Sequence, residues 1–213
     1  MSALTVIIPA SPSSQFNETL QQFSVADSVK KILLLHDGGE IPDHAKCEGL
    51  RVTGWHSGKT LNAVFKSIKT PYALLVLPAA EIQLGQRALE RLLTAAESTR
   101  AGMVYAGFFE IKNGARSEHP LNDYQIGSVR DNFDFGSVLL FNMAAVRASL
   151  KKYGAIANVE FAGLYDLRLK LSLHHELFHI QEFLYTGESC DTASQASRRL
   201  SAAALQESSQ AFA

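Results

Sequence analysis

Short apolar runs alternate along the chain with segments in which apolar residues recur every three or four positions. The apolar runs predict strands, and they lie near residues 4–9, 31–36, 50–55, 72–77 and 102–111. The recurring apolar residues predict helix stripes between these strands: Phe16, Leu20 and Phe23, then Leu61, Phe65 and Ile68, then Ala88, Leu89, Leu92 and Leu93. This alternation predicts an α/β three-layer domain with a mostly parallel central sheet and right-handed crossovers.

The pattern changes after residue 112. The sequence Lys112-Asn113-Gly114 predicts a turn, and the next twenty residues are polar and poorly periodic, which is typical of a functional loop. An apolar run from Val138 to Phe141 and a helix from Ala144 to Lys152 follow. The leucines of 164–173 fit both a strand alternation and a helix stripe.

Composition fits one soluble domain. The chain has 213 residues and 23.3 kDa, with 46% apolar and 19% charged residues. We expect a domain over 1–190 and a tail over 191–213, rich in Ser, Ala and Gln, that is a weak helix or partly disordered. A formal net charge of −1 provides no broad attraction to nucleic acid or to an anionic membrane.

The sequence has neither a recognisable membrane-spanning segment nor a recognisable secretory signal. The sequence has no apolar stretch of the length, about 20 residues, that spans a bilayer, and its start lacks the features of a secretory signal. Cys47 and Cys190 form no C-x-x-C pair, so we expect reduced thiols in a cytoplasmic protein, with a single disulfide as the alternative.

Several short motifs occur in a characteristic order. The chain opens with Val6-Ile7-Ile8-Pro9-Ala10, continues with His36-Asp37-Gly38-Gly39, and then has Gly58-Lys59-Thr60-Leu61-Asn62. Further along come Asp134-Phe135-Gly136-Ser137-Val138-Leu139 and Tyr165-Asp166-Leu167-Arg168-Leu169. Together with Leu184-Tyr185, this order resembles the family 2 glycosyltransferases of the GT-A fold over most of residues 4–187.

The stretch from Ala101 to Tyr185 also resembles a group of bacterial glycosyltransferase-like proteins with eroded acidic motifs. The resemblance favours a helix over 164–173. It implies an inverting transferase that moves a sugar from a nucleotide-diphosphate donor, expected to be a UDP-sugar, to a saccharide or lipid-linked acceptor. The acceptor would lie beside residues 131–137.

The resemblance also implies a donor site. Pro9, Ala10 and Ser11 would hold the nucleoside, together with Asp37, which would accept a hydrogen bond from the uracil N–H. Asp37 is equally typical of an Asp-Gly turn. Lys59 would offset the diphosphate charge beside a helix N-terminus, or it is a solvated helix-start lysine. Asn62 would orient this loop or face solvent.

The metal motif of the family is missing. Where the family has Asp-x-Asp, this chain has Leu77-Pro78-Ala79-Ala80-Glu81. Glu81 is the carboxylate left to help bind Mg²⁺ or Mn²⁺, with phosphates and waters supplying the other ligands. Its alternative is a surface acid.

The general base is also displaced. Leu164 occupies the place where the family carries its catalytic acid, so Asp166 or Glu160 would replace it. Asp166 can instead form a salt bridge with Lys170 one helical turn away. These losses leave a second hypothesis open, in which the chain is a catalytically inactive glycan-binding or interaction domain of the same fold.

A third hypothesis comes from His175-Glu176-Leu177-Phe178-His179, which matches the His-Glu-x-x-His pattern of zinc hydrolases. The pattern requires a continuous helix, yet the alternation from His179 to Tyr185 predicts a strand. Other residues with both structural and functional interpretations are Arg130, as a cation for a phosphate or sugar carboxylate, and Phe133 and Phe135, as stacking platforms.

Overall fold

The computed structural model describes residues 2–11, 13–39, 41–77, 82–112, 114–125 and 133–188. Glu81 and Arg130 lie outside these ranges, as does the predicted tail over 191–213. None of the helices in the described part of the chain combines the length and the apolar character that a membrane span requires.

The described residues form a nine-stranded sheet with the order β3-β2-β1-β4-β8-β6-β9-β5, and β7 pairs with β6. Among these strands, β5, β7 and β8 run against all the others, so the sheet is mostly parallel. The strand bounds are β1 (Leu4–Pro9), β2 (Val29–His36), β3 (Cys47–Arg51), β4 (Tyr72–Val76), β5 (Ile82–Leu84), β6 (Met103–Lys112), β7 (Ala115–His119), β8 (Val138–Asn142) and β9 (Leu177–Glu188).

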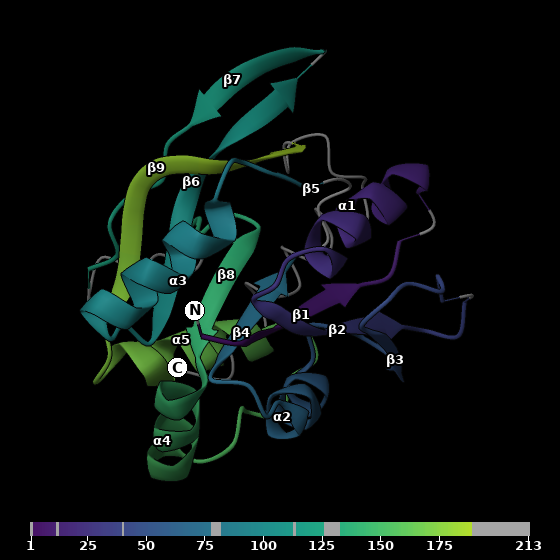
Figure 1. Ribbon diagram of the computed structural model, residues 1–213. Coiled ribbons are helices and arrows are strands. Elements are labelled where there is room, and N and C mark those ends of the chain that lie inside the picture. The colour runs from purple at the N-terminus through teal and green to yellow at the C-terminus, as the bar shows by residue number, and fades with distance from the viewer. Residues whose placement is uncertain are drawn as a thin grey trace.

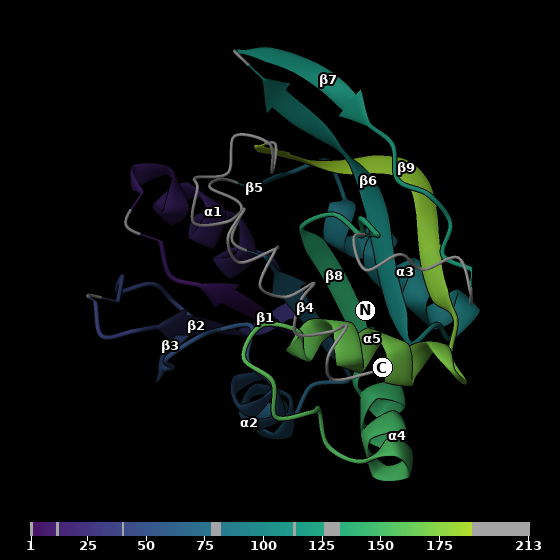
Figure 2. The same ribbon diagram turned by 180° about the vertical axis from the view of Figure 1, so that it is seen from behind.

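Helices cover both faces of this curled sheet. α1 and α3 lie on one face, and α5 lies on the other, where it packs against α2 and α4 (Figures 1 and 2). The helix bounds are α1 (Ser14–Ser24), α2 (Gly58–Ser67), α3 (Ala88–Thr99), α4 (Met143–Tyr153) and α5 (Gly163–Ser172).

Local sequence explains where several helices begin. The side chains of Ser13, Ser57 and Asn142 accept hydrogen bonds from backbone N–H groups in the first turns of α1, α2 and α4. These are ordinary N-caps, which replace bonds that the first turn of a helix cannot make internally.

The core follows the predicted apolar runs. Every residue of β4 is buried, and so are Leu4 to Ile8 of β1. These strands are covered on both sides, which is why they appear in the sequence as continuous apolar runs. The predicted stripes Phe16/Leu20/Phe23 and Leu61/Phe65/Ile68 are buried in the same core.

The structure corrects three predictions. The third strand covers Cys47–Arg51 instead of 50–55, and β5 and β7 were not predicted. The hairpin of β6 and β7 occupies the first part of the segment expected to be a loop. β3 and β7 are mostly exposed, so they lack the apolar pattern that reveals a buried strand, and β5 has only three residues. The helix expected over 164–173 is confirmed as α5.

Candidate functional site

The carboxyl ends of β1, β2 and β4 meet at one edge of the sheet. β1 pairs in parallel with β2 on one side and with β4 on the other, so the strand order changes direction at β1. In open α/β sheets, ligands bind at such a switch point, outside the carboxyl ends of the strands. We call this place the carboxyl edge.

The predicted nucleoside residues lie at the carboxyl edge. Pro9 ends β1, and Ala10 donates its backbone N–H to the carbonyl of Leu35 in β2 at 2.7 Å. Ser11 follows half-buried, while Asp37, directly after β2, is exposed. The two strand ends are therefore tied together, with the side chain of Asp37 accessible beside them.

A cation missed by the sequence analysis lies beside this turn. The guanidinium of Arg51, the last residue of β3, packs against Gly38, which has a φ of +130°. Gly38 allows the backbone conformation that few other residues adopt. The signal for Arg51 is available only after the parallel pairing of β2 and β3 is known.

Lys59 lies in the first turn of α2 with its side chain exposed. The backbone N–H groups around it are largely used within the protein: Gly58 donates to the carbonyl of Val159 at 2.9 Å, and Thr60 donates to the Ser57 hydroxyl at 3.2 Å. At the start of α2, a ligand would therefore interact with the Lys59 ammonium rather than with free backbone N–H groups.

Asn62 and Asp166 both hold the segment that leads into α5. The Asn62 amide donates to the carbonyl of Ile156 at 2.9 Å and accepts the Ile156 N–H at 3.0 Å. The Asp166 carboxylate accepts the N–H of Ala157 at 2.8 Å. Two side chains that were predicted separately thus bind adjacent residues of one segment, 155–162.

Asp166 is nearly enclosed. It is 3% exposed, and the oxygen that binds Ala157 also pairs with the Lys170 ammonium at 2.6 Å, as the alternative interpretation of the sequence expected. A general base must come within hydrogen-bond distance of the acceptor hydroxyl. The enclosed and paired carboxylate of Asp166 therefore suits a structural role better than that of a general base. Glu160, in the same segment, is exposed.

Aromatic rings gather beside the strand end of β4. Leu77 donates its N–H to the carbonyl of Ser137 at 2.8 Å, which places the residues before β8 next to the end of β4. In that stretch Phe133 and Phe135 contact each other with ring centroids 4.5 Å apart, and Tyr124 packs against both. We call Tyr124, Phe133 and Phe135 the aromatic cluster.

A half-buried arginine of α5 faces this cluster. The Arg168 guanidinium carbon lies 4.6 Å from the centre of the Phe135 ring, and Nε is enclosed without a hydrogen-bond partner. Burial lowers the pKa of Arg168 to about 10, against the smaller opposing effect of nearby groups such as Asp134. Arg168 lies within the motif Tyr165 to Leu169, but the sequence analysis assigned it no role.

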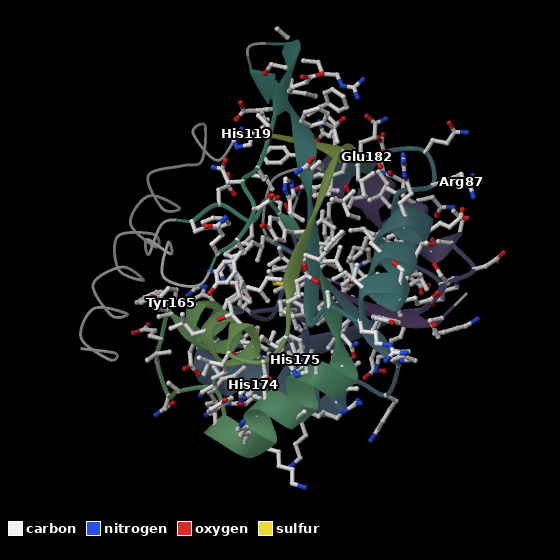
Figure 3. All side chains as sticks on the ribbon, turned by 90° about the vertical axis from the view of Figure 1, so that its left-hand side faces the viewer. Arg87, His119, Tyr165, His174, His175 and Glu182 are labelled. Atoms are coloured by element: carbon white, nitrogen blue, oxygen red, sulfur yellow. The ribbon has the colours of Figure 1, made fainter. Side chains whose placement is uncertain are left out.

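The carboxylate between Phe133 and Phe135 in the chain is already engaged. Asp134 accepts the N–H of Gly136 at 2.7 Å and contacts the ring of His119 at 3.0 Å. His119 belongs to β7 and stacks on Phe108. Figure 3 shows His119 and Tyr165 of α5 on one side of β9, and Arg87, the residue before α3, on the other.

Metal binding receives no support from clustering of ligands. Within the described ranges, no group of three or more His, Cys, Asp or Glu side chains is arranged to hold a metal ion. Glu81, the predicted ligand, lies outside those ranges. A divalent cation at the carboxyl edge therefore stays a prediction from sequence.

The zinc-hydrolase hypothesis does not fit the structure. α5 ends at Ser172, His175 lies in the following turn, and His179 is within β9. The two histidines are therefore not on one helix, which the zinc motif requires. His179 instead contacts Asp123 at 2.8 Å and stacks on Tyr105. The strand expected from His179 onward is confirmed.

A separate hollow of about 1450 Å³ lies between α3 and the first half of β9. Its lining includes Arg87, Arg91, His175 and His179, and it contains none of the residues predicted for the donor. Arg91 forms an ion pair with Glu182 across it. It is therefore distinct from the carboxyl edge.

Comparisons with known proteins identify the fold. No protein-family model matches the chain, and no curated protein matches it by sequence. Among solved structures, residues 1–349 of TarS from S. aureus match with a TM-score of 0.62 and 12% identity. The match covers 98% of this chain and 72% of the TarS chain. The same protein in complex with UDP-GlcNAc matches with a TM-score of 0.63 and 12% identity, covering 94% and 65%.

Two further matches show the breadth of this fold. The longer structure of TarS matches with a TM-score of 0.65 and 12% identity over 94% of this chain, which spans 39% of the TarS chain. The 4-diphosphocytidyl-2C-methyl-D-erythritol synthase of Anaerococcus prevotii DSM 20548 matches with a TM-score of 0.54 and 12% identity, covering 94% and 95%. At this identity the likeness concerns the fold, and the fold is that of GT-A-like nucleotide-sugar transferases.

Proposed function

We propose that the chain binds a nucleotide-diphosphate sugar, expected to be a UDP-sugar, at the carboxyl edge and transfers the sugar with inversion to a saccharide or lipid-linked acceptor. The observation that supports this most is the meeting of the β1, β2 and β4 ends at a switch in strand order. The structures of TarS with UDP and with UDP-GlcNAc share this fold and bind ligands of this class.

In this proposal the donor is held from two sides. Pro9, Ala10 and Ser11 line the nucleoside, and Asp37 accepts a hydrogen bond from the base. Lys59 approaches the diphosphate as a point charge. Its exposure leaves the ammonium free to move toward a ligand.

A divalent cation is part of the proposal only through Glu81. One carboxylate can share Mg²⁺ or Mn²⁺ with diphosphate oxygens and water. The ion would neutralise the leaving diphosphate when bound. Glu81 lies outside the described residues, and those residues contain no group of three or more potential ligands, so we assign no step to the metal.

We assign proton removal from the acceptor hydroxyl to Glu160. Its segment is joined to the start of α2, the helix that carries Lys59, by the hydrogen bond from Gly58 to the carbonyl of Val159. Asp166, buried under Lys170, holds the segment in place and is a positioning residue. The two carboxylates predicted as alternatives thus receive different roles.

Calorimetric titration of UDP, with and without Mn²⁺, tests the donor site. We expect saturable binding that weakens in Asp37→Ala and Lys59→Ala. Lys66→Ala is the matched control, because Lys66 is exposed in the last turn of the same helix. If neither UDP nor another common nucleoside diphosphate gives heat, the donor proposal is wrong.

A second function is a non-catalytic glycan-binding or interaction domain of the same fold. The structural use of Asp166 favours it, because one of the two carboxylates expected to replace the family's catalytic acid is enclosed and paired with Lys170. Slow hydrolysis of the bound UDP-sugar separates the two functions. Hydrolysis that is lost in Glu160→Gln, with UDP binding intact, excludes the non-catalytic domain.

A further inference from the structure

Arg168 is a half-buried cation for which the described residues provide no paired carboxylate. Its Nε is fully enclosed and makes no hydrogen bond, and no ion pair joins the guanidinium to a carboxylate of the described residues. Buried charges in proteins are normally paired, because removing an ion from water costs free energy that a partner must offset. An unpaired guanidinium in such a place calls for an explanation.

The groups around Arg168 are poor substitutes for a counter-charge. The ring of Phe135 stabilises the guanidinium through a cation–π contact at 4.6 Å. Tyr124 and Tyr165 act on it electrostatically, but neither is a carboxylate. Asp134 is the nearby carboxylate, and its contacts go to His119 and Gly136.

Its position suggests what could supply the missing charge. Phe135, under the guanidinium, is two residues from Ser137, whose carbonyl binds Leu77 at the end of β4. Arg168 therefore lies on the face of the sheet covered by α5, beside the segment expected to adjoin the acceptor. The Arg168 side chain as a whole is half-buried, so it is reachable from outside.

We propose that Arg168 binds an anionic group, a phosphate or a carboxylate, carried by the acceptor. The assignment to the acceptor rests on the proposed function, whereas the anion site itself does not. The planar guanidinium presents its donors as a fork that matches both kinds of oxyanion. Stacking on Phe135 fixes the plane of that fork before the ligand arrives.

Arg116 provides a matched control within the chain. It also stacks on a phenylalanine, with its guanidinium carbon 3.6 Å from the centre of the Phe109 ring. Arg116 is exposed on β7, so water already satisfies its donors. If cation–π stacking alone explained Arg168, the two arginines would respond alike to added anions.

The test is NMR observation of the arginine Nε–H signals of the whole protein. Inorganic phosphate, acetate and chloride are titrated at equal ionic strength, and the Arg168 signal is assigned from its loss in Arg168→Lys. We expect phosphate, acetate or both to shift the Arg168 signal saturably, and the Arg116 signal to follow ionic strength only. The stronger of the two anions identifies the acceptor group as phosphate or carboxylate.

Thermal unfolding is the second measurement. Arg168→Met removes the unpaired charge, so we expect a melting temperature equal to or above that of the wild type. The anion that binds should raise the melting temperature of the wild type and of Arg116→Met, but not that of Arg168→Met. Arg168→Lys should weaken the binding by about tenfold or more, because the fork is lost.

Three results would overturn the inference: an Arg168 signal that responds like Arg116, equal responses to chloride and to the oxyanions, or a marked fall in melting temperature for Arg168→Met. Calorimetry of the wild type with UDP is read separately. If an anion shifts the Arg168 signal saturably but UDP does not bind, the donor proposal is wrong and the anion site stands. If UDP binds but no anion shifts the Arg168 signal saturably, only the anion site is wrong.

Discussion

The side chain of Asn62 in α2 holds the backbone of Ile156 from both sides, donating to its carbonyl and accepting its N–H at 2.9 and 3.0 Å. This paired contact crosses from one helix to a segment 94 residues away in the chain. The two hydrogen bonds are made to both backbone polar groups of one residue, as in a pair of β-strands. They fix the position of the segment 155–162 relative to α2.

Asn62→Ala should lower the free energy of unfolding by about 1–3 kcal/mol, because it leaves both polar groups of Ile156 without their partner. Urea denaturation measures the change. Lys66→Ala, an exposed substitution in the same helix, should stay within about 0.5 kcal/mol of the wild type. Equal stabilities of the two variants would show that the segment is not held by Asn62.

Lys170→Met should be more damaging. Lys170 and Asp166 have side chains that are 13% and 5% exposed, so loss of the ammonium leaves a buried carboxylate unpaired. We expect a loss of about 3–5 kcal/mol. Lys31→Met breaks an exposed pair with Glu48 and should cost less than about 1 kcal/mol. A loss at Lys170 no larger than at Lys31 contradicts this assignment.

Gly58→Ala should disrupt the junction of α2 with the same segment. A Cβ at Gly58 would lie 1.8 Å from the carbonyl oxygen of Ala157, which is backbone and cannot simply rotate away. We expect a loss of about 1–3 kcal/mol or more, together with weaker UDP binding. Gly39→Ala is the control, since a Cβ there meets nothing within 4 Å. A stable Gly58→Ala protein would mean that the two backbones separate readily.

His175 predicts a pH dependence of stability. Burial, and then the neighbouring His174, lower the pKa of His175 in the folded protein below its ordinary value of 6.5. The unfolded chain then takes up this proton at a higher pH than the folded one, so the stabilisation is present above pH 6.5 and is lost as the pH falls below it. His175→Gln should flatten this dependence in urea denaturation between about pH 5 and 7. If the free energy of unfolding of His175→Gln depends on pH as steeply as that of the wild type, His175 is not the group responsible.

The buried strands of the fold could be predicted from sequence, and the edge strands could not. β1 and β4 are apolar throughout because helices cover both of their faces, and their bounds agree with the predicted runs to within one residue. β3 and β7 are mostly exposed, and their residues carry no comparable pattern. Pairing alone makes them strands, and pairing depends on partners distant in the chain.

The same limit applies to the site. The salt bridge of Asp166 with Lys170 could be predicted because it is local to one helical turn. The pairing of Asn62 with Ile156 and the stacking of Arg168 on Phe135 join residues that only the fold brings together. The sequence therefore indicated the local partner of Asp166, but not the distant contacts of Asn62 and Arg168.

The place of β9 in the sheet affects how the protein is made. β9 is contributed late in the sequence, yet it inserts between β6 and β5 (Figure 1). While the chain is still emerging from the ribosome, one edge of β6 therefore has no neighbour, and bare strand edges attract other chains. We expect nascent chains stalled before Leu177 to depend on chaperones far more than chains released after Glu188.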